Sequence, residues 1–209
     1  MIDLKLNSSA DLKKEGKSFY WASFFLPKSY KKNAGTLYSI CRYFDDIADK
    51  YSEDQTIYLK NSIEEIRTNK NNKVNIFLQK NKINKLIFID LIEGLILDQK
   101  KIRIQNKEEL IKYSYHVAGT VGLMMSKIIG VKHKKAARSA IDLGIGMQLT
   151  NIARDVYEDS KMKRIYLPAN WIPDISLKNL TDLHDKSPEK DERISNAIHE
   201  VIDLSDKFY

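Results

Sequence analysis

The sequence is poor in the residues that shape disulfide-rich and β-rich proteins: its 209 residues include one cysteine, four prolines and eight glycines. A single cysteine, Cys41, excludes an internal disulfide and is typical of a reducing cytosol. The scarcity of proline and glycine argues against a turn-rich β architecture and favours long helices. With 43% hydrophobic and 30% charged residues, the chain has the composition of a globular protein that can bury a core.

Long apolar runs are also missing. No stretch of the sequence reaches the length of a membrane-spanning helix, and the N-terminus lacks the apolar centre of a signal peptide. The longest uncharged segment, residues 113–126, contains His116 and several hydroxyl groups, and we expect it to form a helix buried inside the protein. We therefore expect a cytoplasmic protein.

An arginine-rich stripe is absent as well, although the net charge is +7. The lysines are scattered along the chain, so we expect no nucleic-acid partner. A basic surface favours anionic lipid headgroups or diphosphate substrates instead. This charge predicts peripheral association with the inner face of the membrane.

Apolar residues recur at helical spacing through most of the chain. The pattern predicts helices over residues 8–25, 29–50, 53–68, 76–100, 107–129, 134–160, 176–184 and 188–209, with a polar loop at 69–75. Gly130 is expected to end the helix that precedes it. Because no repeat or linker divides the chain, we expect one all-α domain over residues 1–209. Helical periodicity continues to Tyr209, which predicts a fragment whose C-terminal helices are missing.

The first chemical signal is a pair of aspartates, Asp45 and Asp49. Residues four apart lie on the same face of a helix, where two carboxylates repel each other by a few tenths of a kcal/mol. A divalent cation reverses that effect, and Mg²⁺ prefers carboxylates together with phosphate oxygens and water. Tyr38 and Arg42 fall on the same face and add an aromatic ring and a guanidinium suited to diphosphate oxygens.

A second polar stripe follows more than a hundred residues later. Gln148, Asn151, Asp155 and Asp159 follow the spacing i, i+3, i+7, i+11, which keeps them on one face of a helix. The opposite face carries apolar residues: Leu149, Ile152 and Val156.

A lone Asp-x-x-x-Asp is common on exposed helices, whereas two matched stripes predict helices that face each other around bound cations. The candidate ligands for Mg²⁺, with Mn²⁺ as the alternative metal, carry carboxylate or amide oxygens: Asp45, Asp49, Asn151, Asp155 and Asp159.

Four segments resemble the squalene/phytoene synthase family, and bacterial phytoene synthases in particular. They are the opening motif at 17–27, the first aspartate motif at 37–49, the central helix at 113–125, and the second aspartate motif with its exit at 148–171. The resemblance implies an isoprenoid synthase fold, in which a single helical domain surrounds a central apolar cavity with both aspartate motifs at its mouth.

The resemblance also implies a reaction and its residues. The reaction is head-to-head (1′-1) condensation of two geranylgeranyl diphosphates to phytoene through a cyclopropyl (prephytoene) diphosphate, in carotenoid biosynthesis and without NADPH. Catalytic roles are implied for the four aspartates and for Tyr38 and Tyr113. Substrate binding is implied for Ser18, Phe19, Arg42, Val117, Val121, Gln148, Asn151 and Arg154.

Three alternatives remain. A squalene-type or dehydrosqualene-type enzyme would use two farnesyl diphosphates, and chain length depends on a cavity depth that the sequence does not give. A non-catalytic relative, such as a respiratory complex assembly factor, would be expected to lose aspartates that are all present here. A chain-elongating prenyltransferase shares the pattern of the first motif, but the second motif and the segment Lys17-Ser18-Phe19 argue against it.

Overall fold

The computed structural model describes residues 21, 23–50, 52–99, 103–181 and 187–209. These residues form helices and connecting loops, and their one strand-like feature is an isolated bridge between Arg103 and Ile165. The predicted all-α class is therefore confirmed. None of the described helices combines the length and the hydropathy needed to cross a membrane.

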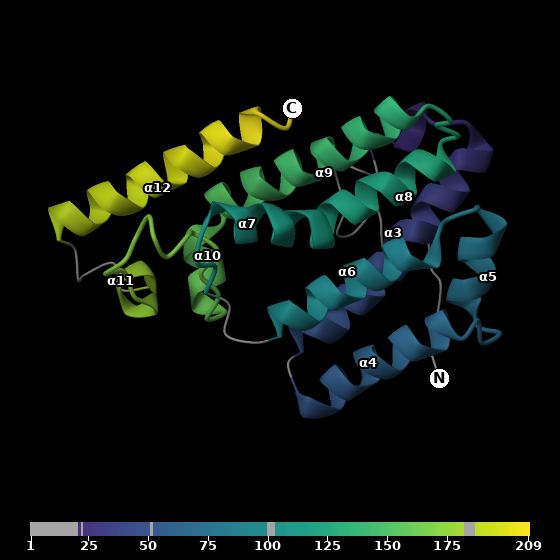
Figure 1. Ribbon diagram of the computed structural model, residues 1–209, viewed down its shortest axis with the longest axis horizontal. Coiled ribbons are helices and arrows are strands. Elements are labelled where there is room, and N and C mark those ends of the chain that lie inside the picture. Colours follow the sequence, from purple (N-terminus) through teal and green to yellow (C-terminus); the bar gives the residue numbers. More distant parts are fainter. Residues whose placement is uncertain (1–20, 22, 51, 100–102, 182–186) are drawn as a thin grey trace.

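Figure 1 shows the described helices as an elongated assembly. The α-helices are α3 (Lys28–Asp49), α4 (Glu53–Arg67), α5 (Lys73–Lys80), α6 (Lys85–Asp98), α7 (Lys107–Ser114), α8 (Thr120–Ile128), α9 (Lys134–Arg154), α10 (Val156–Lys161), α11 (Leu177–Thr181) and α12 (Pro188–Asp206). A 3₁₀ turn, η1, spans Ser23–Phe25, and a π-helical turn, η2, spans Tyr115–Gly119 between α7 and α8. Of the helix predicted over 8–25, residues 8–20 and 22 lie outside the described residues.

Several predicted boundaries differ because asparagine caps start helices that hydrophobic periodicity alone does not reveal. Asn72 accepts a hydrogen bond from the backbone N–H of Asn75, so α5 begins inside the segment predicted as a loop. The helix predicted over 76–100 is two helices, because Lys82 has a positive φ of 54° and Asn84 caps α6. Gly130, with φ of 83°, follows the end of α8 as predicted.

Among the described residues, the buried apolar side chains form two clusters. The first joins α3, α4, α5, α6 and α8, and its fully buried members include Phe44 and Phe88, whose rings meet edge to face at 5.4 Å. The second joins α7, α9 and α12 to the segment 165–180. In Figure 1, α4 and α5 lie toward one end of the molecule and α12 toward the other, while α9 runs alongside α8 between them. The chain therefore has two apolar halves with a junction between them.

Helix α9 packs closely against η2 and α8 at that junction. A Cβ added to Gly144 would lie 2.5 Å from the carbonyl oxygen of Ala118, and one added to Gly122 would collide with the carbonyl oxygen of Ala140. Gly144 and Gly122 thus permit the close approach of these segments, because neither carries a Cβ. The uncharged segment 113–126 is only partly buried: residues such as Thr120 and Met124 are buried, whereas Val117 and Val121 are half-buried.

Candidate active site

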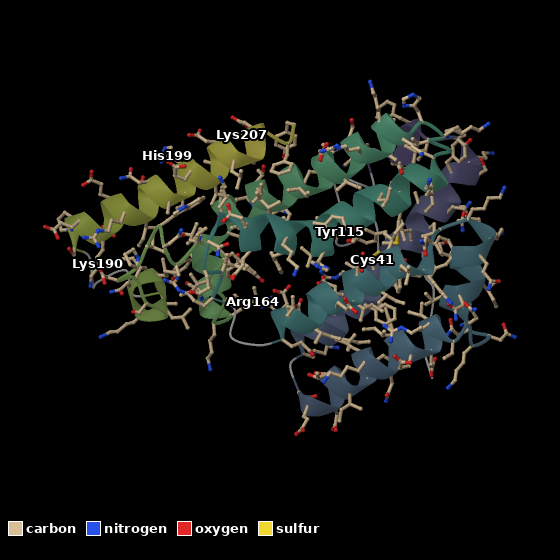
Figure 2. The ribbon with its side chains drawn as sticks, viewed as in Figure 1. Cys41, Tyr115, Arg164, Lys190, His199 and Lys207 are labelled. Atoms are coloured by element: carbon tan, nitrogen blue, oxygen red, sulfur yellow. The ribbon has the colours of Figure 1, made fainter. Side chains whose placement is uncertain are left out.

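The first aspartate motif lies on one uninterrupted helix, α3, as predicted. The guanidinium of Arg42 lies 2.8 Å from Asp45 through Nη1 and 2.8 Å from Asp46 through Nε. Asp49 is the last residue of α3, and its Oδ1 accepts a hydrogen bond of 3.0 Å from Nη2 of Arg164, which is labelled in Figure 2. Tyr38 is half-buried one turn before Arg42. The motif is therefore both a local ion-pair network and the attachment point of a distant arginine.

The second aspartate motif does not lie on the single helix predicted over 134–160. Helix α9 ends at Arg154, Asp155 has φ of −104° and ψ of 18°, and α10 starts at Val156. Figure 1 shows α10 running at an angle to α9. Aspartate is a poor residue for a helix interior, and Asp155 makes two hydrogen bonds of 2.6 Å with the guanidinium of Arg154.

The break nevertheless keeps the spacing of the motif. The backbone N–H of Asp155 donates to the carbonyl of Asn151 at 2.9 Å, and that of Asp159 donates to the carbonyl of Asp155 at 2.9 Å. These two bonds have the i to i−4 pattern of an α-helix. Asp155 and Asp159 therefore stay one turn apart although the helix is interrupted between them.

Asp98, the last residue of α6, is a site residue that the sequence analysis did not identify. Its two carboxylate oxygens accept hydrogen bonds of 2.7 Å from the hydroxyls of Tyr113 and Tyr166. One signal was available: Asp98 continues the i, i+4, i+7 stripe of Leu91 and Leu95, both of which are buried. Arg164 and Tyr166 were part of the family resemblance but were not predicted as site residues.

Burial and crowding raise the pKa of one aspartate in each motif. The pKa of Asp45 rises to about 6, first through burial and then through the charge of Asp49. The pKa of Asp159 rises to about 7, through burial and then through Asp155, while Arg164 opposes the shift. Asp98 contributes to both rises. The region therefore carries excess negative charge, which bound cations would relieve.

In the structure, several of the predicted metal ligands pair with arginines. Within the described residues no group of three or more His, Cys, Asp or Glu side chains is arranged to hold a metal ion. Three motif aspartates pair with arginines: Asp45 with Arg42, Asp49 with Arg164, and Asp155 with Arg154. The carboxylate and amide oxygens of the two motifs are the donors that Mg²⁺ prefers, so the residue types fit the metal. Metal binding by Asp45, Asp49, Asn151, Asp155 and Asp159 stays a prediction.

The other predicted site residues lie on the elements between and beside the motifs. Tyr113 is buried on α7, and Gln148 and Asn151 are half-buried on α9. Val117 packs against the second core cluster, and Val121 packs against the first, so these two valines lie at the junction of the halves. Ser18 and Phe19 lie outside the described residues.

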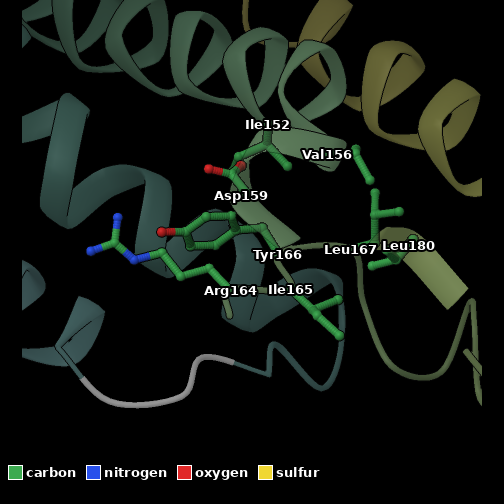
Figure 3. Close-up of a pocket in the computed structure, with 8 residues that line it drawn as sticks. All are labelled: Ile152, Val156, Asp159, Arg164, Ile165, Tyr166, Leu167 and Leu180. Carbon is green, nitrogen blue, oxygen red and sulfur yellow. The ribbon is translucent and has the colours of Figure 1, made fainter. Parts of the chain in front are cut away.

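A small pocket opens beside Asp159 (Figure 3), and its lining comes from α9, α10, α11 and the segment after α10: Ile152, Val156, Asp159, Arg164, Ile165, Tyr166, Leu167 and Leu180. In Figure 3 the charged or hydroxyl ends of Asp159, Arg164 and Tyr166 lie together on one side, and Leu167 and Leu180 lie on the other. The cavity volume is about 10 Å³, which is room for one water molecule. This pocket is not the predicted prenyl cavity, which stays a prediction.

The helical architecture places the chain among the all-α isoprenoid synthase folds. The crystal structure of a dehydrosqualene synthase in complex with ligand superposes with a TM-score of 0.81 at 26% identity, covering 97% of this chain and 73% of that one. The squalene/phytoene synthase family matches residues 12–209, and the chain belongs to that family.

Two curated relatives show which branch of the family the chain resembles. The 15-cis-phytoene synthase of Enterobacter agglomerans is 28% identical over 217 residues, covering 92% of this chain and 70% of the relative. The 15-cis-phytoene synthase of Paracoccus sp. is 28% identical over 226 residues, covering 100% of this chain and 72% of the relative. The resemblance drawn from the sequence motifs is therefore confirmed.

Proposed function

We propose that this chain catalyses head-to-head (1′-1) condensation of two geranylgeranyl diphosphates to phytoene through a cyclopropyl diphosphate, in carotenoid biosynthesis. The observation that carries the proposal is the ion pair between Asp49 on α3 and Arg164 just after α10, which ties the two aspartate motifs together. The two relatives named 15-cis-phytoene synthase support the C20 substrate.

The charged residues of the site suit diphosphate binding. Mg²⁺, held by the aspartates and Asn151, would supply the charge that neutralises the diphosphate leaving group. Arg42, Arg154 and Arg164 each pair with a carboxylate in the structure. The planar guanidinium binds phosphate oxygens with the same geometry as carboxylate oxygens. We expect Arg42 and Arg154 to exchange carboxylate for diphosphate when substrate binds.

Ionisation of an allylic diphosphate leaves a carbocation that must be kept from water. The aromatic rings of Tyr38 and Tyr113 can stabilise such a cation through their electron-rich faces. Val117 and Val121, at the junction of the two apolar halves, offer side chains without a nucleophile. We assign these residues to the walls of the reaction zone.

The test is to incubate the protein with Mg²⁺ and either geranylgeranyl or farnesyl diphosphate, without NADPH, and to analyse the hydrocarbons. Phytoene from the C20 substrate is expected, with no product when Mg²⁺ is chelated. Formation of C30 products alone would show that the phytoene assignment is wrong. It would support a dehydrosqualene-type enzyme, which the solved structure at 26% identity favours.

We also propose that the protein associates with the membrane surface, where the lipid-like substrates reside. The net charge of +7 supports attraction to anionic headgroups. Co-flotation with vesicles rich in anionic lipid should be strong at low salt and weak at high salt. Equal flotation with neutral vesicles would contradict an electrostatic association.

A further inference from the structure

Asp98 lies between the two aspartate motifs, although neither motif contains it. Its Oδ2 accepts a hydrogen bond of 2.7 Å from the hydroxyl of Tyr113, and its Oδ1 accepts one of 2.7 Å from the hydroxyl of Tyr166. Both distances are the usual length of a hydrogen bond between a hydroxyl donor and an oxygen acceptor. Each carboxylate oxygen of Asp98 therefore accepts a hydrogen bond from a different tyrosine.

The two tyrosines form one unit with this carboxylate. Their rings stack with centroids 4.9 Å apart and planes inclined by 24°. Tyr113 is 5% exposed and Tyr166 is 6% exposed, so neither hydroxyl can rely on bulk water for a partner. Asp98 comes from α6, Tyr113 from α7 and Tyr166 from the segment after α10. Three separate parts of the chain thus meet at one carboxylate.

The carboxylate of Asp98 interacts electrostatically with aspartates of both motifs. Asp98 contributes to the raised pKa of Asp45 in the first motif and of Asp159 in the second. Burial raises the pKa of Asp98 itself, while the two tyrosine hydroxyls and Arg164 oppose that rise. Arg164 also binds Asp49, so a single guanidinium compensates Asp98 and connects the motifs.

We propose that Asp98 is a positioning residue of the reaction site and acts through Tyr113 and Tyr166. A phenol has one hydroxyl hydrogen, so a hydroxyl that donates to Asp98 can only accept at its other positions. Asp98 therefore fixes both phenols with oxygen lone pairs, and not hydrogens, available to a positively charged group. The inference rests on the proposed function, in which that group is the allylic carbocation.

A competing role for Asp98 is that of a further metal ligand. Both carboxylate oxygens already accept short hydrogen bonds from tyrosines, and a metal would have to displace at least one of them. The two roles differ in what a neutral replacement changes. A positioning residue affects the rate of the chemical step, whereas a metal ligand affects the Mg²⁺ concentration that the enzyme requires.

The decisive variant is Asp98→Asn, which keeps the shape but replaces one acceptor oxygen with a donor group. Only one tyrosine hydroxyl can then still donate to an oxygen of this side chain. We expect kcat to fall about 10- to 100-fold, as for other residues that orient a catalytic group. KM for the diphosphate and the half-activating Mg²⁺ concentration should change by less than about twofold. In a Tyr113→Phe background the same substitution should lower kcat less, because the two residues act together.

The matched control is Asp90→Asn on the same helix. Asp90 accepts a hydrogen bond of 3.3 Å from Tyr115 and takes no part in the proposed site. The Asp90→Asn substitution should leave kcat unchanged. Near-UV circular dichroism gives a readout independent of turnover: Asp98→Asn should alter the tyrosine signal while the far-UV helical signal is kept, and Asp90→Asn should preserve the contribution of the stacked pair.

Each result decides between the roles. Unchanged kcat in Asp98→Asn overturns the inference, and a tenfold or greater rise in the Mg²⁺ requirement, about 1.4 kcal/mol, assigns Asp98 to the metal instead. If the unmodified protein converts neither diphosphate, the proposed function fails. The tyrosine signal then decides the inference alone, and its retention in Asp98→Asn overturns the positioning role.

Discussion

The two aspartate motifs carry the same side-chain pattern on different backbones. In the first, Asp45 and Asp49 lie on the continuous helix α3. In the second, the helix stops at Arg154, and Asp155 stands at the break before α10. Hydrogen bonds across the break keep Asp155 and Asp159 one turn apart. The spacing of the carboxylates is therefore preserved without a continuous helix.

The arginines of the two motifs also differ. Arg164 is 13% exposed and reaches from the end of the second motif to Asp49 of the first. Arg154 is 66% exposed and pairs with its sequence neighbour Asp155. A partly buried cation that joins distant segments contributes to the fold, whereas an exposed pair between neighbours contributes little. Arg164 is thus the structural link, and Arg154 is free to leave Asp155 for a diphosphate.

The largest expected effect tests whether both motifs are needed. Asp45→Ala and Asp155→Ala should each lower Mg²⁺-dependent diphosphate release by about a thousandfold or more, because metal ions supply several kcal/mol of charge stabilisation. Asp174→Ala removes an exposed aspartate that pairs with Arg193 and should keep activity. Unchanged turnover in either motif variant would contradict the assignment of that motif to the site.

The next effect compares how firmly each motif helix is anchored. Leu37 on α3 and Leu149 on α9 are both fully buried. Leu37→Ala and Leu149→Ala should each lower the free energy of unfolding by about 2–5 kcal/mol, measured by denaturant titration. Leu86→Ala, at a position 55% exposed, is the control and should cost little. A small loss for Leu149→Ala alone would mean that α9 is loosely packed near its break.

A smaller effect separates the two arginines. Arg164→Gln should lower the free energy of unfolding of the metal-free protein by about 1–3 kcal/mol, because it leaves partly buried carboxylates without their cation. Arg154→Gln should lower it by less than about 1 kcal/mol, since an exposed pair is screened by water. Equal losses in the two variants would argue against a structural link through Arg164.

The smallest effect concerns pH. The folded protein holds protons on Asp45 up to about pH 6 and on Asp159 up to about pH 7, against an ordinary value of 3.8. The folded state therefore binds more protons than the unfolded chain in this window, and these groups lower the stability of the metal-free protein as pH rises through it. When the pH is raised from 5 to 8, the melting temperature of the Asp159→Asn variant should fall less than that of the unmodified protein. Identical pH profiles would show that Asp159 is not perturbed.

The sequence predicted the features that depend on local periodicity. The helix over 29–50 corresponds to α3, and the helix over 107–129 corresponds to α7, η2 and α8. The first stripe, Tyr38 to Asp49, could be placed on one face because its helix is regular. The second stripe, Gln148 to Asp159, was placed correctly in spacing but wrongly on an unbroken helix.

The missed features depend on contacts between segments far apart in sequence. No sequence pattern near Asp98 indicates that its carboxylate accepts hydrogen bonds from Tyr113 on α7 and from Tyr166. Arg164 lies 115 residues from its partner Asp49, so helical spacing could not reveal the pair. Asn84 and Asp155 changed helix boundaries through capping and side-chain pairing, which hydrophobic periodicity does not register.

The central claim is that two differently built motifs form one metal–diphosphate site. Isothermal titration with a non-reactive prenyl diphosphate analogue in the presence of Mg²⁺ tests it most directly. The unmodified protein should bind the analogue only with Mg²⁺, and Asp49→Ala in α3 and Asp159→Ala in α10 should each abolish that Mg²⁺-dependent binding. Binding that survives undiminished in either variant would contradict the claim that both motifs hold the same ligand.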